Sequence, residues 1–143
     1  MNERPSVVPM VSYEDTAAMA DWLCLTFGFV EVVRLHDADG AVAHVELRHN
    51  GGAIFLGTPG PTYRSPASHR RTCATADAWL RVTHVVDGVL VRVADVDEHF
   101  RRVRVLGATI LSAPEDAGPG RLYRAEDPEG HRWMFLQDDY RSE

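Results

Sequence analysis

The sequence predicts an α+β fold made of two copies of a βαβββ module within one domain, residues 1–143. Strand-forming and helix-forming segments occur in the same order in the two halves. Asp95, a helix-capping residue, lies 80 residues after Asp15, and Gly107, a helix stop, lies 79 residues after Gly28. A chain of 143 residues that is 45% hydrophobic also has the size and apolar content of a single domain.

The first module is predicted over residues 7–57. It begins with a strand at residues 7–12, where Pro9 is typical of an edge strand or a strand start. Asp15 can accept hydrogen bonds from the first turn of a helix, an apolar stripe at helical spacing follows, and Gly28 ends the helix. Asp-Gly and Asn-Gly-Gly turn signals then separate three strands, at residues 29–35, 41–48 and 53–56.

A connector, residues 58–87, is predicted between the modules. It contains three prolines and no long periodic run, apart from a stretch at residues 75–82 that favours a short helix. Connectors of this length usually cover a functional site or cross to another part of the assembly. Both a lid and a plain crossing remain open, and Trp79 is the aromatic residue best placed for a lid.

The second module is predicted over residues 88–137. A strand at residues 89–93 leads into a capping box formed by Asp95 and Glu98, and the helix runs to Gly107. Three strands follow, the last two joined by a type I turn with the sequence Asp-Pro-Glu-Gly. These strands are expected at residues 108–112, 121–125 and 132–137.

Composition excludes several classes of function. A net charge of −6 disfavours nucleic-acid binding, which requires a basic surface. No apolar run is long enough to span a bilayer, and the first residues lack the apolar core of a signal peptide, so a cytoplasmic location without membrane contact is expected. The two cysteines lack metal-ligand spacing. Cys24 lies in the apolar part of a helix, where burial raises the pKa of a thiol.

Two stretches carry a family resemblance: SYEDTAAMADWLCLTFGF near the start, and GVLVRVADVDEHF…VLGATILSAPED…RLYRAEDPEGHRWMFLQ in the second half. They resemble the vicinal oxygen chelate superfamily, which includes glyoxalase I, bleomycin-resistance proteins, fosfomycin-modifying enzymes and extradiol dioxygenases. The resemblance covers about residues 7–137. It implies mixed sheets that curl into a ligand cup, and a homodimer, which also agrees with the expected open sheet edges.

The same resemblance allows the metal site to be checked. Metal-using members of this family place His or Glu ligands on the first and last strands of each module. The corresponding positions here are Val8, Phe55, Gly88 and Met134. None offers an imidazole or carboxylate, so we expect no metal and no cofactor.

Strand alternation, together with these positions, predicts which side chains line the cup. Arg92 and Arg132 are candidates for binding a carboxylate or phosphate, because guanidinium groups bind such anions in a planar, bidentate manner. Alternatively, they neutralise Glu46 or lie at the rim, and the face of Arg124 is undecided. The predicted ligand-binding set is Met10, His44, Glu46, Phe55, Leu90, Arg92, Arg132 and Met134.

The histidines and large aromatic residues have more ordinary interpretations. His44 and Glu46 share a strand face, where they form either a hydrogen-bonded polar pair, a metal pair lacking a third ligand, or an acid–base pair. Core packing is expected for Trp22, Tyr123 and Trp133. The six remaining histidines are expected at the surface: His36, His49, His69, His84, His99 and His131.

The function predicted from these observations is metal-independent binding of a small molecule, with the protein sequestering or carrying an aromatic or anionic metabolite. A mostly apolar cup with a few polar groups is typical of such sites. The alternative is an enzyme. It would be either a cofactor-free isomerase or cyclase that uses His44 and Glu46 as general base and acid, or a lyase or dioxygenase with an atypical metal site.

Overall fold

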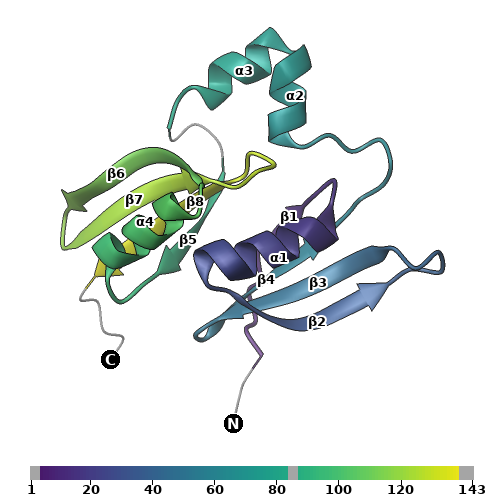
Figure 1. Ribbon diagram of the computed structural model, residues 1–143, viewed down its shortest axis with the longest axis horizontal. Helices are drawn as coiled ribbons and strands as arrows, with labels where there is room; N and C mark the ends of the chain where they lie inside the picture. Colours follow the sequence, from purple (N-terminus) through teal and green to yellow (C-terminus); the bar gives the residue numbers. More distant parts are fainter. Residues whose placement is uncertain (1–3, 84–86, 139–143) are drawn as a thin grey trace. The chain divides into compact units, whose positions relative to one another are not determined.

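The computed structural model describes residues 4–83 and 87–138, so the prediction for His84 lies outside the described residues. The chain divides into two compact units, residues 1–65 and 66–143. Each unit contains one four-stranded mixed sheet and the helix that follows its first strand (Figure 1). The predicted α+β fold with two βαβββ modules is therefore confirmed.

The first unit has the strand order β1-β4-β3-β2. β1 is parallel to β4, and the other neighbours are antiparallel. β1 is shorter than predicted because Pro9 has no amide hydrogen to donate, although its carbonyl accepts from Phe55 N at 3.0 Å. The elements are β1 (Met10–Ser12), α1 (Thr16–Phe27), β2 (Val30–His36), β3 (Val42–His49) and β4 (Gly52–Gly57).

Helix α1 begins and ends where the sequence predicts. Asp15 Oδ1 accepts a hydrogen bond from Ala18 N at 3.0 Å, and Gly28 follows the helix at φ 89°, a conformation that favours glycine. The helix lies against one face of the sheet and buries apolar side chains there. The core of this unit is formed by Met19, Ala20, Leu23 and Phe27 of the helix and by Val45, Leu47, Ile54 and Leu56 of the sheet.

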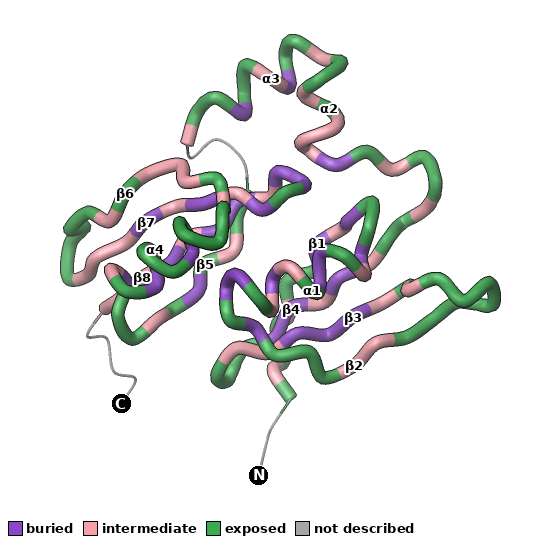
Figure 2. Tube along the Cα trace, viewed as in Figure 1, coloured by how far each residue is buried: buried purple, intermediate pink, exposed green. Residues whose placement is uncertain are grey.

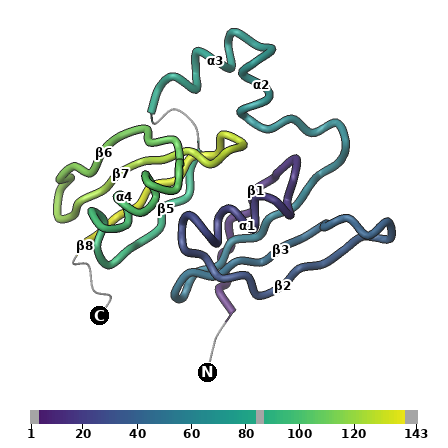
Figure 3. Tube along the Cα trace, in the orientation of Figure 1, coloured from purple at the N-terminus to yellow at the C-terminus, as the bar shows by residue number. Residues whose placement is uncertain are grey.

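The second unit repeats this arrangement with the strand order β5-β8-β7-β6, in which β5 is parallel to β8. Figure 3 follows the same succession of strand, helix and three strands through both units. The elements are β5 (Gly88–Arg92), α4 (Val96–Val105), β6 (Thr109–Ala117), β7 (Gly120–Glu126) and β8 (Arg132–Asp138). β6 runs past Pro114, because this edge strand has two register shifts that tolerate a missing amide hydrogen.

Two short helices precede the second sheet: α2 (Pro66–Thr72) and α3 (Ala74–Leu80). The sequence predicted only one helix here, over residues 75–82. Helix α2 starts against the hairpin that joins β7 to β8, where Ala67 N donates to Glu129 O at 2.9 Å. Gly130 permits this approach, because its φ is 91° and a Cβ there would lie 2.7 Å from Ala67 N.

The core of the second unit corrects one expectation. His99 was expected at the surface, but it is only 7% exposed, and its Nδ1 is hydrogen-bonded to the Tyr123 hydroxyl at 2.6 Å. The reason is helical spacing: His99 lies three residues after Val96 and four before Val103, so all three face the sheet. Burial also raises the pKa of Tyr123.

Trp133 and Tyr123 are buried as predicted, whereas Trp79 is 61% exposed on α3. In each sheet most of the buried strand residues lie on the two central strands, and the edge strands are mostly exposed or half-buried (Figure 2). Among residues 4–83 and 87–138, none of the helices has the length and apolar character that crossing a bilayer requires.

Candidate functional site

Each sheet has an open face, by which we mean the face turned away from α1 in the first unit and from α4 in the second. Residues opposite one another on paired strands share a face. In the first unit, Phe55 is opposite both Met10 and Glu46. In the second, Met134 is opposite both Leu90 and Arg124. The eight predicted ligand-binding residues therefore lie on the open faces, four in each unit, and their role in binding stays a prediction.

On the open face of the first unit, His44 and Glu46 form the polar pair that the sequence predicts. His44 Nε2 lies 3.2 Å from Glu46 Oε1, and the His44 ring packs edge-on against Phe55 with centroids 5.0 Å apart. Glu46 is only 9% exposed and is also paired with Arg4, whose Nη2 lies 3.6 Å from Oε2. The side chain of Arg4 is 76% exposed, so His44 is the closer of the two partners of this carboxylate.

A cavity of about 380 Å³ opens beside this pair. Met10 and Phe55 supply apolar walls, and His44 supplies a polar one. Met10 is 83% exposed, so its side chain is accessible at this cavity. The first unit thus presents a hydrophobic surface next to a histidine that is hydrogen-bonded to a buried carboxylate.

The open face of the second unit holds a smaller cavity of about 170 Å³. Its apolar lining includes Leu90, Leu111 and Met134, and two arginines, Arg124 and Arg132, also line it. The two guanidinium groups differ sharply in how many hydrogen bonds and ion pairs they make with other protein atoms.

Arg132 is engaged by protein atoms at both of its Nη nitrogens. Nη1 donates to Val82 O at 3.0 Å and to Thr83 O at 3.2 Å. Nη2 donates to Leu80 O and pairs with Glu126 Oε2 at 3.0 Å. These three carbonyls and one carboxylate match the four Nη hydrogens of an arginine. The arrangement does not support the predicted anion-binding role of Arg132, and its carboxylate partner is Glu126 rather than Glu46.

Arg124 is held much less firmly. Its side chain is 24% exposed, and its ion pair with Glu115 spans 3.7 Å between Nη1 and Oε1. Sequence reasoning left its face undecided, although the hairpin register would have settled it. Glu126 is opposite Arg132, so Arg124, two residues earlier, is opposite Met134.

Arg92, the other predicted anion-binding residue, lies at the exposed end of β5. Its side chain is 61% exposed, and Nε lies 3.3 Å from each carboxylate oxygen of Asp138. This position matches the alternative in which an arginine occupies the rim.

The open faces do not fit the metal site that the family resemblance implies. Of the ligand positions that the resemblance implies, Phe55 is opposite Met10 and Met134 is opposite Leu90, whereas Gly88 is opposite Arg132. Thioether, aromatic and aliphatic groups are poor ligands for the divalent ions that such sites hold. Across residues 4–83 and 87–138, no three His, Cys, Asp or Glu side chains are grouped to hold a metal ion.

Cys24 and Cys73 line neither of these two cavities. Cys24 is half-buried in α1, and burial, followed by the charge of Glu31, raises the pKa of its thiol. This agrees with the prediction that burial raises the pKa of this thiol, and a raised pKa makes the thiol less reactive because only the thiolate is a strong nucleophile.

Comparison with known proteins agrees with this fold. TioX from Micromonospora sp. ML1 is 32% identical, with a TM-score of 0.68 over 92% of this chain and 96% of TioX. TnmS3, described as an antibiotic binding protein from Streptomyces sp. CB03234, is 20% identical and shares the fold, with a TM-score of 0.65 over 96% of this chain and 99% of TnmS3.

A sequence relative and a family model extend the likeness. An uncharacterized protein of Mycobacterium bovis is 32% identical over 138 residues, which is 96% of this chain and 86% of the relative. The model of the glyoxalase/bleomycin resistance protein/dioxygenase superfamily matches residues 7–135. This chain therefore belongs to the glyoxalase/bleomycin resistance protein/dioxygenase superfamily.

Proposed function

We propose that this protein binds a small aromatic acid without a metal ion, and that it sequesters or carries this ligand. The observation that carries the proposal is the cavity of the second unit, where Leu90 and Met134 provide an apolar surface beside the loosely held guanidinium of Arg124. Small-molecule sites combine a mostly apolar lining with a few placed polar groups.

The size of the cavity indicates what part of a ligand it accepts. An apolar cavity of about 150 Å³ holds a benzene ring, whereas sites for drug-sized molecules span roughly 300–1,000 Å³. At about 170 Å³, this cavity suits one aromatic ring or one ring-bearing substituent. That TnmS3 is described as antibiotic-binding supports an organic ligand on this fold.

Arg124 is the reason that we propose an acidic ligand. Its partner Glu115 has a side chain that is 60% exposed, and the pair is 3.7 Å long. Exposed ion pairs of this kind contribute little to stability, about 0–1 kcal/mol. A ligand carboxylate that accepts two hydrogen bonds from the guanidinium can therefore replace Glu115.

Benzoate is the simplest probe of this proposal, because it combines one ring with one carboxylate. The methyl signal of Met134 should shift on titration with benzoate in NMR spectra, and the melting temperature should rise. Arg124→Met should weaken benzoate about tenfold or more, because one charge-assisted hydrogen bond contributes about 1.5–3 kcal/mol.

Arg121→Met is the matched control, because Arg121 pairs with Asp97 and Asp116 and does not line the cavity. It should leave benzoate binding unchanged. The proposal fails if benzoate shifts no signal of the open face, or if both variants bind it equally well.

Metal independence has its own test. Elemental analysis of protein purified without a chelator should find well under one metal ion per chain, and EDTA should change neither the fold nor benzoate affinity. Stoichiometric metal whose removal abolishes binding would contradict the proposal.

The first unit supports a second candidate function, proton transfer without a cofactor. The hydrogen bond of 3.2 Å between His44 and Glu46, beside a cavity lined by Phe55, is the observation that favours it. A histidine oriented by a carboxylate is a common general base. Deuterium exchange at the acidic C–H of aryl ketones in D₂O, followed by NMR, should be accelerated by the protein and abolished by His44→Gln. An equal rate with and without the protein would remove this candidate.

A further inference from the structure

Arg132 connects two parts of the second unit that are far apart in sequence. It lies on β8, yet it donates to the carbonyls of Leu80, Val82 and Thr83, which lie 49–52 positions earlier in the chain. Leu80 is the last residue of α3, so its carbonyl is one of those that a helix leaves without an internal partner. Arg132 thus binds the end of α3 and the residues that follow it to the open face of the sheet.

The anchored segment forms part of the cavity wall. Thr83 lines the cavity together with Gly88, Leu90 and Arg132 itself. Gly88 also brings β5 close to Arg132, since a Cβ at position 88 would lie 3.1 Å from the Arg132 carbonyl oxygen. The boundary of the cavity on this side therefore depends on the side chain of Arg132.

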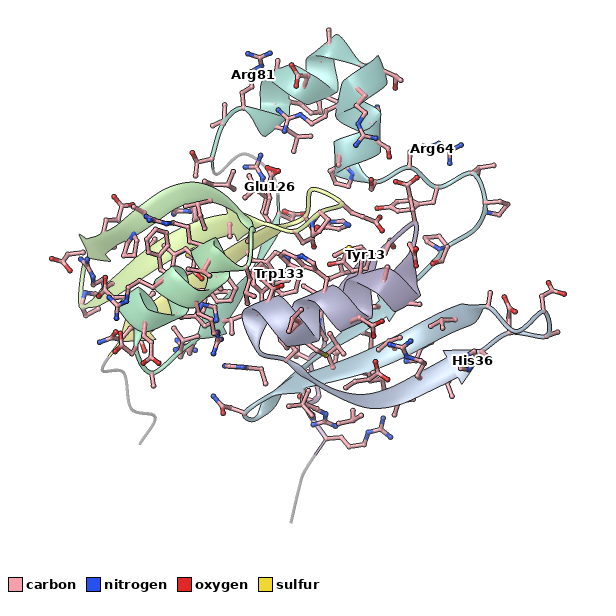
Figure 4. All side chains as sticks on the ribbon, in the orientation of Figure 1. Tyr13, His36, Arg64, Arg81, Glu126 and Trp133 are labelled. Carbon is pink, nitrogen blue, oxygen red and sulfur yellow. The ribbon has the colours of Figure 1, made fainter. Side chains whose placement is uncertain are left out.

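The buried positive charge of Arg132 is balanced by a nearby carboxylate. The residue is only 5% exposed, and a buried cation is costly unless it is paired and hydrogen-bonded. Glu126, whose side chain is 11% exposed, supplies the opposite charge from β7, at the end of the sheet that faces α3 (Figure 4). Lysine at this position would keep the charge but would lose the planar group that reaches three carbonyls at once.

We propose that Arg132 is the positioning residue that sets the size selectivity of this cavity, because it holds residues 80–83 in place as a wall. This inference rests on the proposed function of the same cavity. With the wall held, the cavity accepts one ring and excludes two fused rings. With the wall released, the cavity opens on the side of Thr83, and this discrimination is lost.

Two variants separate the role of the wall from simple loss of fold. Arg132→Lys keeps a buried positive charge opposite Glu126. The double variant Arg132→Met with Glu126→Gln removes both charges, so neither is left buried and unpaired. Arg121→Met again serves as the control, since it removes an arginine from two ion pairs outside the cavity.

Hydrogen exchange tests the wall without any ligand. In both Arg132 variants, amide protection in the peptide that contains residues 80–83 should fall by about tenfold or more, while protection in β7 and β8 is retained. In Arg121→Met the protection of this peptide should not change. Unchanged protection of residues 80–83 in the Arg132 variants would overturn the inference.

Titrations with benzoate and 2-naphthoate, followed at the Met134 methyl group, test selectivity. The wild type should prefer benzoate about tenfold, which corresponds to about 1.4 kcal/mol. Both Arg132 variants should bind the two acids about equally. A preference that survives in the variants would contradict the inference even if the wall is released. If the wild type binds neither acid, the proposed function fails and the size selectivity fails with it, whereas binding of both acids with equal affinity would overturn only the inference.

Discussion

The two open faces have the same strand pattern and carry opposite charges at equivalent positions. Met10, Phe55 and Glu46 form a row across the first sheet, and Leu90, Met134 and Arg124 form the corresponding row across the second. The helix-facing sides, by contrast, are apolar in both units. Packing against a helix restricts a position to apolar side chains of suitable size, whereas an open face is free to change charge.

The charged residues also differ in how they are neutralised. Glu46 has a hydrogen-bonded neighbour in His44 at 3.2 Å in addition to a long ion pair of 3.6 Å with the exposed Arg4, whereas Arg124 has only its long ion pair with the exposed Glu115. The carboxylate of the first unit is therefore hydrogen-bonded to a neighbouring histidine, while the guanidinium of the second unit has only a long ion pair, which an external carboxylate can replace. This contrast is the reason that the proposed acid-binding site lies in the second unit.

The largest expected difference between the units lies in their last hairpins. Asp127 is 3% exposed, and its carboxylate accepts hydrogen bonds from Glu129 N, His131 N and Trp133 Nε1 at 3.0–3.1 Å. Asp127→Ala should lower the free energy of unfolding by about 3 kcal/mol or more, because it removes the charged acceptor of three hydrogen bonds.

Asn50→Ala, in the corresponding hairpin of the first unit, is the control for Asp127. Asn50 is exposed, so its loss should cost only about 1 kcal/mol, the strain of placing alanine at a left-handed φ of 51°. Urea unfolding of both variants measures the difference. Equal losses would show that the Asp127 network contributes little.

The next effect concerns ligand charge. Benzoate should shift the Met134 methyl signal at concentrations about tenfold lower than those that shift Met10, since one charge-assisted hydrogen bond contributes about 1.5 kcal/mol or more. Benzyl alcohol, which lacks the charge, should show no such preference. Met19 is buried in the first core and serves as an internal reference. A preference of benzoate for Met10 would reverse the comparison of the two faces.

The N-caps of α1 and α4 should contribute equally to stability, because both are local hydrogen bonds of the same kind. Asp15 Oδ1 accepts from Ala18 N at 3.0 Å, and Asp95 Oδ1 accepts from Glu98 N at 3.1 Å. Asp15→Ala and Asp95→Ala should each cost about 1 kcal/mol, the usual effect of losing an N-cap. Thermal unfolding should therefore give similar losses for both variants, and a difference of several-fold would break the equivalence.

The smallest effect is a pH dependence specific to the second unit. The hydrogen bond from Arg121 lowers the pKa of Asp97. A carboxylate with a lowered folded-state pKa stabilises the protein above its unfolded pKa, and this stabilisation is lost as the pH falls through the folded-state value. Arg121→Met should therefore flatten the acid side of the stability curve, measured by urea unfolding between about pH 5 and pH 2. An unchanged curve would show that solvent screens this exposed pair.

The sequence by itself determined the two modules, their order and the ends of their helices. These features depend on local signals, namely the Asp caps, the Gly stops and the turn residues, which act within a few positions. Strand alternation also placed the predicted binding residues on the open faces, since its period of two is a property of the backbone.

Only the tertiary structure decided how each charged side chain is used. Arg132 is anchored to carbonyls about 50 positions away, Arg124 faces the cavity beside Met134, and Arg4 pairs with Glu46. Such contacts join residues distant in sequence, and alternation specifies the face of a side chain but not its partner. Burial of His99 was readable from helical spacing, whereas the partner of each arginine depended on how the folded chain brought distant carbonyls and carboxylates together.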